Sequence, residues 1–251
     1  MKVLAVGDLH FKEIYPYAEK FEDRRLDERR QIEDEIVKAS KECDAVVLMG
    51  DVFDSRQNSY RTVQAVTSFV ERFGDKRVII MAGNHENSAD GTSALDYLRE
   101  ISGKNWLVVN DAVFTENDLV FIPYFRRAQW EVETDAEVVD KIIGQLSKRK
   151  CKALFIHHAI AGTATESGQM TDLFHEPVFP QKELLKAAGF VFGAHIHLPT
   201  DAGRVTVLGS VMNHDVGEVA DKRVVIFDTE AGTIQNWPLP GRKFAKLVNP
   251  T

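Results

Sequence analysis

The chain contains little cysteine and no hydrophobic run long enough to cross a bilayer. Its 251 residues include only two cysteines, Cys43 and Cys151, which lie far apart and outside any CxxC pair. A disulfide framework or a cysteine-ligated zinc site is therefore not expected, and both residues are predicted to be reduced thiols. The longest apolar runs, such as 45–49 and 78–82, are far shorter than the ~20 residues of a membrane helix. We expect a soluble, cytoplasmic protein without a membrane partner.

The chain also lacks an excess of positive charge. Its net charge is -7 and its sequence pI is ≈ 5.7, which argues against binding nucleic acid by bulk charge alone. Two bound divalent ions would add about four positive charges at the point where a phosphate binds, so this argument is weak at a metal site. Hydrophobic residues make up 44% and charged residues 27% of the chain, a composition that excludes a disordered chain.

The first half of the chain alternates short apolar runs with stretches in which apolar residues recur at helical spacing. Each apolar run ends in a polar segment that contains a glycine. The predicted strands are 2–6, 44–49 and 77–82. The predicted helices are 21–43, 60–73 and 93–101. In a sheet built from such a β-α-β-α-β order, ligands bind beyond the carboxyl ends of the strands.

The second half is richer in strands and contains one long loop, 161–180. The predicted strands are 107–109, 119–123, 153–156, 190–192, 205–208 and 223–228. The predicted helices are 135–147 and 181–188. A loop of this length inside a compact domain is usually functional or mobile. No internal repeat or low-complexity linker divides the chain, so residues 1–251 are interpreted as a single domain.

Polar residues follow the apolar runs at five places. These segments are Asp8-Leu9-His10, Gly50-Asp51, Gly83-Asn84-His85-Glu86, His157-His158 and His195-Ile196-His197. One such segment alone is weak, because a single histidine after a strand is more often structural. Six of the eight histidines fall in these segments, however, and together with the aspartates they suit a borderline divalent metal such as manganese, iron or zinc. The set therefore predicts a metal site.

The same segments, written GDLH, GDVFD, GNHE, HH and HIH, resemble the five motifs of the calcineurin-like metallophosphoesterase superfamily. The resemblance runs from Val3 to about Glu218. It implies an α/β fold of four layers, αββα, in which two mixed β-sheets pack face to face and are flanked by helices. One position departs from the pattern, because Ala194 stands where glycine usually precedes the first histidine of the last motif. Alanine is small, so the ligands should be preserved.

The family pattern also implies a role for each polar residue and a cofactor of two divalent metal ions. One ion would be held by Asp8, His10 and His197, the other by Asn84, His157 and His195, with Asp51 between them. His85 would face the substrate as the catalytic residue, where it stabilises charge on the phosphorus or protonates the leaving oxygen. The two ions would lower the pKa of a bridging water, so that the resulting hydroxide attacks the phosphodiester.

Three further segments resemble a narrower group, the SbcD-type DNA nuclease subunits of double-strand-break repair complexes. The segments are GDVFDSR, FIPYFRR (Phe121 to Arg127) and VLGSVMNHDVGE (Val207 to Glu218). This resemblance implies exonuclease and endonuclease action on DNA with Mn2+, in recombination, repair or replication. It also implies an SbcC-type SMC-like ATPase as a partner subunit. A separate capping domain of the kind usual in that group is not expected within residues 1–251.

Basic side chains near the metals would have to contact DNA phosphates. The candidates are Arg56, Arg126 and Arg127, while Arg61 is more readily interpreted as a solvated surface residue. His158 follows the candidate ligand His157 and either faces the substrate or packs in the interior. A homodimer is a further expectation of the resemblance. Phe69 lies off the apolar stripe of the predicted helix 60–73 and is expected to contact another helix, or else a partner chain.

Two alternative functions share these observations. A small-molecule phosphodiesterase or phosphatase with the same dinuclear site would hydrolyse cyclic nucleotides or phosphomonoesters and leave DNA intact. A non-catalytic binding module would keep the fold and lose its metals. The complete ligand set disfavours the second alternative, because a decayed enzyme is expected to lose ligands or the histidine at position 85.

Overall fold

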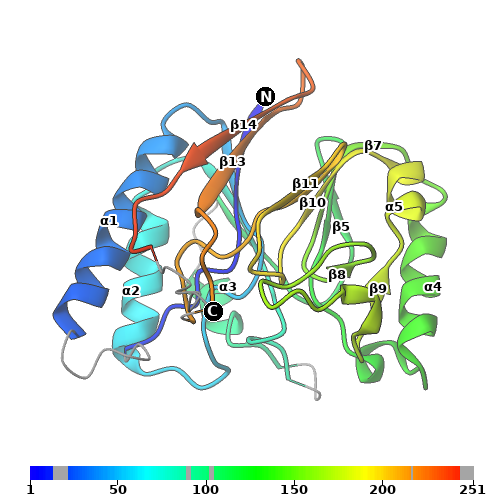
Figure 1. The fold of residues 1–251 in the computed structure, drawn as a ribbon, viewed down its shortest axis with the longest axis horizontal. Coiled ribbons are helices and arrows are strands. Elements are labelled where there is room, and N and C mark those ends of the chain that lie inside the picture. Colours follow the sequence, from blue (N-terminus) through cyan, green and yellow to red (C-terminus); the bar gives the residue numbers. More distant parts are fainter. Residues whose placement is uncertain (14–21, 89–91, 102–104, 216, 244–251) are drawn as a thin grey trace, which may run out of the picture.

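Two six-stranded sheets form the centre of the molecule and pack face to face (Figure 1). The computed structural model describes residues 1–13, 22–88, 92–101, 105–215 and 217–243. The first sheet contains, in spatial order, β14 (Thr233–Pro238), β13 (Arg223–Asp228), β1 (Lys2–Val6), β2 (Ala45–Leu48), β3 (Arg77–Met81) and β4 (Trp106–Val109). The second contains β11 (Thr200–Ala202), β12 (Val205–Val207), β10 (Ala188–Gly193), β7 (Cys151–Ile156), β6 (Leu119–Ile122) and β5 (Phe114–Glu116).

Both sheets are mixed. In the first sheet β1 to β4 are parallel, and β13 pairs antiparallel with β1 and with β14. In the second sheet β6, β7, β10 and β12 are parallel, and β5 and β11 run antiparallel at its two edges. Parallel strands end at the same edge of a sheet, so each sheet gathers its carboxyl-terminal loops at one end.

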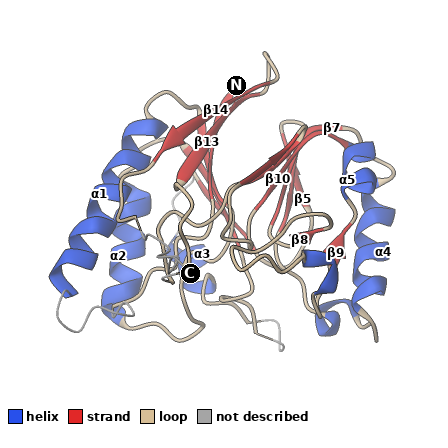
Figure 2. Cartoon of the chain, viewed as in Figure 1, coloured by secondary structure: helices blue, strands red, loops and turns tan. Residues whose placement is uncertain are grey.

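Helices cover the outer face of each sheet, which gives the expected four-layer α/β arrangement (Figure 2). The first sheet is flanked by α1 (Glu22–Ser40), α2 (Tyr60–Glu71) and the short α3 (Asp96–Ile101). The second is flanked by α4 (Asp135–Leu146) and α5 (Gln181–Ala187). Smaller elements are the 3-10 helices η1 (Arg127–Trp130) and η2 (Thr171–Leu173) and the strand pair β8 (Ala159–Ile160) and β9 (Val178–Phe179). No described helix combines the length and apolar character needed to cross a membrane.

Alternation along the strands builds three apolar layers. In β1, Leu4 packs on the helical side, whereas Val3 packs between the sheets. The layer between the sheets is aromatic, because the Phe155 ring stacks on Phe121 at 5.3 Å and on Phe192 at 5.1 Å between centroids. All three rings are fully buried, so the two sheets are held together by close-packed apolar side chains.

The predicted helices and strands are all present, with ends that differ by up to three residues. Residue 21, where one helix was expected to begin, lies outside the described residues. Five strands were not predicted: β5, β8, β9, β11 and β14. Four of these have only two or three residues, and β14 is a mostly exposed edge strand without apolar alternation. The expected loop 161–180 contains η2 and β9 and is therefore partly structured.

Phe69 packs in the apolar layer on the helical side of the first sheet. Its ring is 1% exposed and lies 5.6 Å from Phe11 and 5.1 Å from Phe73 between centroids. Phe11 belongs to the segment after β1, so Phe69 holds that segment against α2. Phe69 also lies in the same buried cluster as Ile32 and Ile36 of α1, in agreement with the expected contact with another helix.

Candidate metal centre

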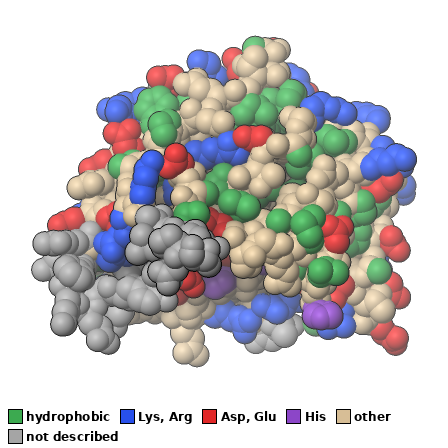
Figure 3. All heavy atoms as spheres, in the orientation of Figure 1, with side chains coloured by type: hydrophobic (Ala, Val, Ile, Leu, Met, Phe, Trp, Pro, Cys, Tyr) green, Lys and Arg blue, Asp and Glu red, His purple; other side chains and the backbone are tan. Residues whose placement is uncertain are grey.

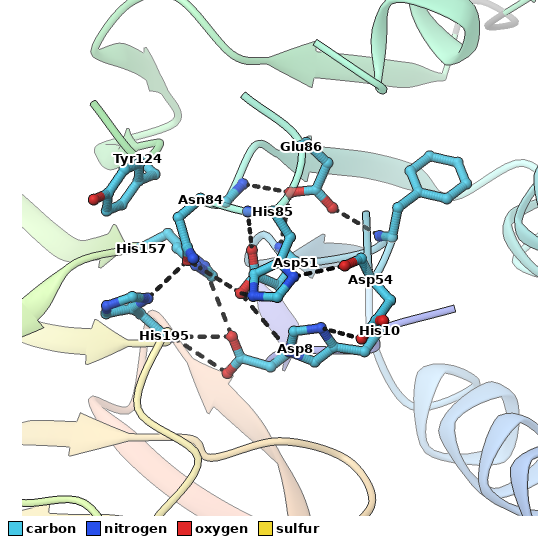
Figure 4. Close-up of polar contacts among 12 residues, drawn as sticks. Asp8, His10, Asp51, Asp54, Asn84, His85, Glu86, Tyr124, His157 and His195 are labelled. Atoms are coloured by element: carbon cyan, nitrogen blue, oxygen red, sulfur yellow. Dashed lines mark hydrogen bonds and ion pairs between the residues drawn. The ribbon is translucent and has the colours of Figure 1, made fainter. Parts of the chain in front are cut away.

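The polar segments identified in the sequence meet where the carboxyl ends of both sheets converge (Figure 4). The first sheet contributes Asp8, His10, Asp51 and Asn84, and the second contributes His157, His195 and His197. A direct link between the sheets lies at the centre, where the His195 N–H donates to Asp8 Oδ1 at 3.0 Å. The seven candidate ligands, which are spread over most of the chain, are thus brought together.

Asp51 lies between two groups of nitrogen and oxygen atoms. On one side, Asn84 Oδ1 lies 2.8 Å from His195 Nδ1 and 3.2 Å from His157 Nε2. His157 Nε2 also lies 3.4 Å from Asp51 Oδ2. On the other side, His10 Nε2 lies 3.7 Å from the same carboxylate oxygen. The bridging position that the family pattern gives to Asp51 is therefore compatible with the geometry.

The donor atoms fit a pair of divalent ions. Two groups of three residues each have their ligand atoms within 4.8 Å of one another inside the group. The first group contains Asp8, His10 and His197, and the second contains Asp51, His157 and His195. Between the first group's imidazoles, His10 Nε2 and His197 Nε2 lie 3.1 Å apart, a distance that requires a proton or a cation between the two lone pairs. Imidazole nitrogen and carboxylate oxygen are suitable donors for borderline divalent metals.

Backbone strain marks the same residues. Seven described residues other than glycine have a positive φ, and four of them are candidate ligands. These four are Asp8, His10, Asp51 and His195. The left-handed region is unfavourable for residues with a Cβ and persists where the surrounding structure enforces it, commonly at functional sites. Glycine is required beside them, because a Cβ at Gly83 would collide with the Asp51 carboxylate.

Charges at the centre are mutually stabilising. Although burial disfavours its charged form, the Asp51 carboxylate raises the pKa of His157 to about 9. Burial likewise opposes ionisation of Asp51, yet His157, His10 and His85 hold the pKa of that carboxyl well below its usual value. The buried centre thus carries a negative potential that attracts cations, and a bound cation would take the place of the imidazole protons.

Each candidate histidine ligand from the second sheet has its outward nitrogen occupied by an acceptor. Met49 O lies 2.6 Å from His157 Nδ1, Glu176 Oε1 lies 2.7 Å from His195 Nε2, and Glu218 Oε1 lies 2.9 Å from His197 Nδ1. Such acceptors determine which nitrogen faces a metal and raise its basicity. No role was expected for Glu176 or Glu218 from the sequence. Glu218 ends the VLGSVMNHDVGE segment. Glu176 lies in the loop 161–180, where no sequence motif around it indicates a role.

His85 lies at the rim of the centre. Its Nδ1 lies 2.7 Å from Asp54 O, its Nε2 lies 4.0 Å from Asp51 Oδ2, and its side chain is 38% exposed. His10, Asp51 and His85 also form a group with donor atoms within 4.8 Å, so distance alone does not separate His85 from the ligands. Its exposure and its place beside an open cavity favour a role toward substrate.

Glu86 connects the loops that carry Asp51 and Asn84. Its fully buried carboxylate accepts hydrogen bonds from three backbone N–H groups, those of Gly83 at 2.7 Å, Asp51 at 3.1 Å and Phe53 at 2.7 Å. Burial and the neighbouring Asp51 carboxylate raise the pKa of Glu86 to about 8. Although GNHE was recognised as a motif, the positioning function of its last residue required the structure.

The expected phosphate-binding arginines separate into two groups. Arg56 and Arg126 line a cavity of about 510 Å3 that also contains His85 and Asn84. Arg126 donates to Asn84 O at 3.2 Å, which holds it at the site. Arg127 instead forms an ion pair with Asp135 at 3.3 Å and does not line this cavity, so it is not placed to contact a phosphate there. Arg61 is exposed on α2.

Of the two alternatives for His158, facing the substrate or packing in the interior, the structure favours packing. The residue is 0% exposed, its Nε2 accepts a hydrogen bond from the Phe125 N–H at 3.0 Å, and its ring stacks on Tyr124 at 4.7 Å. Burial lowers its pKa well below the usual value. Successive side chains of an extended segment point to opposite sides, so His157 faces the centre while His158 packs in the interior.

A further histidine lies against the ligands and was not singled out from the sequence. The ring of His214 lies 4.7 Å from that of His10 and 5.4 Å from that of His197, measured between centroids. Burial lowers its pKa well below the usual value, so the ring is neutral. His214 does not come directly after a strand, so it was not found among the polar residues that follow the predicted strands.

Comparisons with known proteins found a matching family model and similar solved structures. A family model described as calcineurin-like phosphoesterase matches residues 1–199. A crystal structure of TT1561 of Thermus thermophilus is similar to the chain, with a TM-score of 0.54, 14% identity, and coverage of 94% of this chain and 98% of that one. A structure described as a novel archaeal phosphodiesterase has a TM-score of 0.46, 12% identity, and coverage of 95% and 100%. No curated protein sequence matches.

The family model covers most of the chain, including every candidate metal ligand. The fold has the two mixed sheets with flanking helices, and the described residues contain His and Asp clusters able to hold metal ions. The family consists of hydrolases that depend on two metal ions. The chain belongs to the calcineurin-like phosphoesterase family.

Proposed function

We propose that the chain is a manganese-dependent DNA nuclease that hydrolyses phosphodiester bonds. The observation that carries the proposal is the position of His85 between the cluster of candidate ligands and a cavity with two arginines. Its Nε2 faces Asp51 at 4.0 Å, while Arg56 and Arg126 line the same cavity. Hydrolysis of a DNA strand needs both a reactive centre beside His85 and the nearby arginines, because one phosphate reacts while positive charge holds the neighbouring phosphates.

The chemistry divides between the ions and the residues of the chain. When bound, two divalent ions would lower the pKa of a water and neutralise phosphate charge. His85 would protonate the leaving oxygen through Nε2, because its Nδ1 is held by the Asp54 carbonyl. A positioned acid of this kind contributes about 10²–10⁴-fold to the rate. Glu176 and Glu218 would keep His195 and His197 oriented.

A small-molecule phosphodiesterase is the second candidate, and the surface charge favours it. The net charge is -7. Figure 3 shows acidic and basic side chains interspersed over one face of the molecule, without a continuous basic track among the described residues drawn there. Long duplexes are usually bound along such a track, so a substrate with only one or two phosphates fits this surface better.

Substrate comparison with purified protein tests the proposal. With Mn2+, we expect degradation of linear duplex DNA, abolished by His85→Ala and unaffected by His175→Ala, at an exposed histidine that belongs to none of the groups of candidate ligands. If duplex and single-stranded DNA both stay intact while a cyclic nucleotide or another small diester is hydrolysed, the second candidate replaces the first. The SbcC-type partner and the homodimer belong to the same proposal. Light scattering after size-exclusion chromatography tests the dimer.

A further inference from the structure

A second cavity borders the metal centre and is lined by two of the candidate ligands. It has a volume of about 890 Å3 and is lined by His195 and His197 together with apolar side chains of Phe174, Ile196 and Val219. It shares no lining residue with the cavity of His85, Arg56 and Arg126. The candidate ligands therefore lie between two separate cavities.

The two cavities differ in charge. The side of His85 carries two arginines and Asp54, whereas the second cavity carries two histidines and the acidic side chains of Glu166, Asp215 and Glu218. None of the described residues that line the second cavity is a lysine or an arginine that could bind a second phosphate group. An uncharged, flat organic group is suited to a cavity with an apolar wall, and a volume in the range of about 300–1,000 Å3 is usual for small organic ligands.

Ion pairs hold the wall of this cavity to the metal centre. Glu166, from the loop 161–180, accepts a hydrogen bond from the Val219 N–H at 2.6 Å and pairs with Lys222 at 3.4 Å. Lys222 also pairs with Glu218 at 2.8 Å, and Glu218 Oε1 in turn lies 2.9 Å from His197 Nδ1. The Lys222 side chain is 6% exposed, so this chain of contacts is shielded from solvent.

We propose that the second cavity binds an uncharged aromatic substituent that stays on the phosphorus, of the size of a nucleoside. A phosphodiester whose leaving oxygen faces His85 directs its other substituent toward His195 and His197. In the reaction the oxygen of water bonds to phosphorus and loses a proton. The phosphorus–oxygen bond to the leaving group breaks, and that oxygen gains a proton. The nucleoside remains on the phosphate product.

This inference rests on the proposed phosphodiester hydrolysis and specifies the substrate. In DNA, the nucleotide that enters the cavity has to be unstacked, as at a frayed strand end. In a small diester, the same cavity selects nucleoside phosphates over alkyl phosphates. Stacking of one base on an aromatic side chain such as Phe174 changes binding by about 10-fold or more.

Two diesters with the same leaving group test the proposal on the full-length, manganese-loaded protein. These are the p-nitrophenyl ester of thymidine 5'-phosphate and methyl p-nitrophenyl phosphate. We expect kcat/KM to be about 10-fold higher for the thymidine ester, and Phe174→Ala to remove most of that preference. Leu173→Ala, at a neighbouring side chain that is 69% exposed and outside the cavity, is the matched control and should keep it.

Different results would overturn the nucleoside-binding role of the second cavity and the proposed function. Equal kcat/KM for both diesters, or a preference that Phe174→Ala leaves unchanged, overturns the proposal that the second cavity binds a nucleoside. Hydrolysis of neither diester nor of DNA overturns the proposed function itself.

A binding measurement keeps the test valid if Phe174→Ala does not fold. Val219 is 46% exposed, so Val219→Trp can be accommodated while it changes the cavity. Calorimetry should show altered affinity for thymidine 5'-monophosphate and unaltered affinity for methyl phosphate. An equal change for both ligands, or no change for either, contradicts the proposal.

Discussion

The Nδ1 atom of His85 lies 2.7 Å from the backbone carbonyl oxygen of Asp54, and this hydrogen bond determines which ring nitrogen faces the cluster of candidate ligands. A carbonyl only accepts, so Nδ1 carries the proton. The Nε2 atom, 4.0 Å from Asp51 Oδ2, is then the ring nitrogen that faces the candidate ligands. The proposed function assigns the role of general acid to this atom.

The first prediction concerns the leaving group. His85→Ala should lower kcat by about 10²–10⁴-fold for DNA or an alkyl ester, whose leaving alkoxide needs a proton. The loss should be much smaller for a p-nitrophenyl ester, because p-nitrophenolate leaves without one. Metal content, measured by mass spectrometry, should equal that of the wild type. An equal loss for both esters, or a loss of metal, would assign His85 to metal binding instead.

The candidate ligands could be found from the sequence because they follow regular strands. Asp8, Asp51 and Asn84 each come directly after an apolar run or its glycine, and parallel strands end at one edge. Glu176 and His214 could not be found in this way, because they lie on irregular segments that reach the centre only through packing between the sheets. The position of Arg127 outside the cavity of His85 could not be predicted for a similar reason, since its ion pair with Asp135 depends on where α4 begins.

A second prediction concerns Glu86. Glu86→Ala removes the acceptor of three buried backbone N–H groups and should cost about 1–3 kcal/mol for each donor left unsatisfied. Urea unfolding of the metal-free protein measures this cost. Glu71→Ala, at an exposed position of α2, is the control and should change stability little. Equal unfolding free energies for the two variants would mean that Glu86 does not hold the loops of Asp51 and Asn84.

A third prediction concerns the carboxylate behind His197. Glu218→Gln should weaken metal binding by about 10–100-fold, because the acceptor that orients the imidazole is weakened while the ligand itself stays. A titration of the metal-free protein with Mn2+ measures the change. Glu230→Gln, at an exposed residue far from the centre, should bind Mn2+ as the wild type does. Unchanged affinity in Glu218→Gln would show that His197 needs no such support.

A fourth prediction concerns the layer between the sheets. Phe155→Ala should lower the free energy of unfolding by about 3–5 kcal/mol, because its ring fills the space between Phe121 and Phe192. Tyr60→Ala, at a side chain that is 76% exposed, should have an effect within about 0.5 kcal/mol. Chemical denaturation of both variants gives the comparison. A loss below 1 kcal/mol for Phe155→Ala, roughly the cost of an ordinary substitution, would contradict the importance of this aromatic layer.

The last prediction concerns the two thiols and pH. Burial raises the pKa of Cys43 and of Cys151 to about 11, so both are neutral thiols at pH 8 in the folded protein. Only the thiolate reacts with iodoacetamide, and the reaction rate of the folded protein should still rise between pH 9 and pH 10.5.

Unfolded protein in urea provides the control, because its thiols should titrate near the usual value, so the rate should be half-maximal near pH 9 and level off above about pH 10. The folded pKa is raised, so the contribution of the neutral thiols to stability is complete below pH 9 and is lost as the pH rises through 11. The difference in urea midpoint between wild type and the Cys43→Ala, Cys151→Ala double variant should therefore fall above pH 9. A folded-state rate that is half-maximal near pH 9, as in the unfolded protein, would show that solvent reaches both thiols.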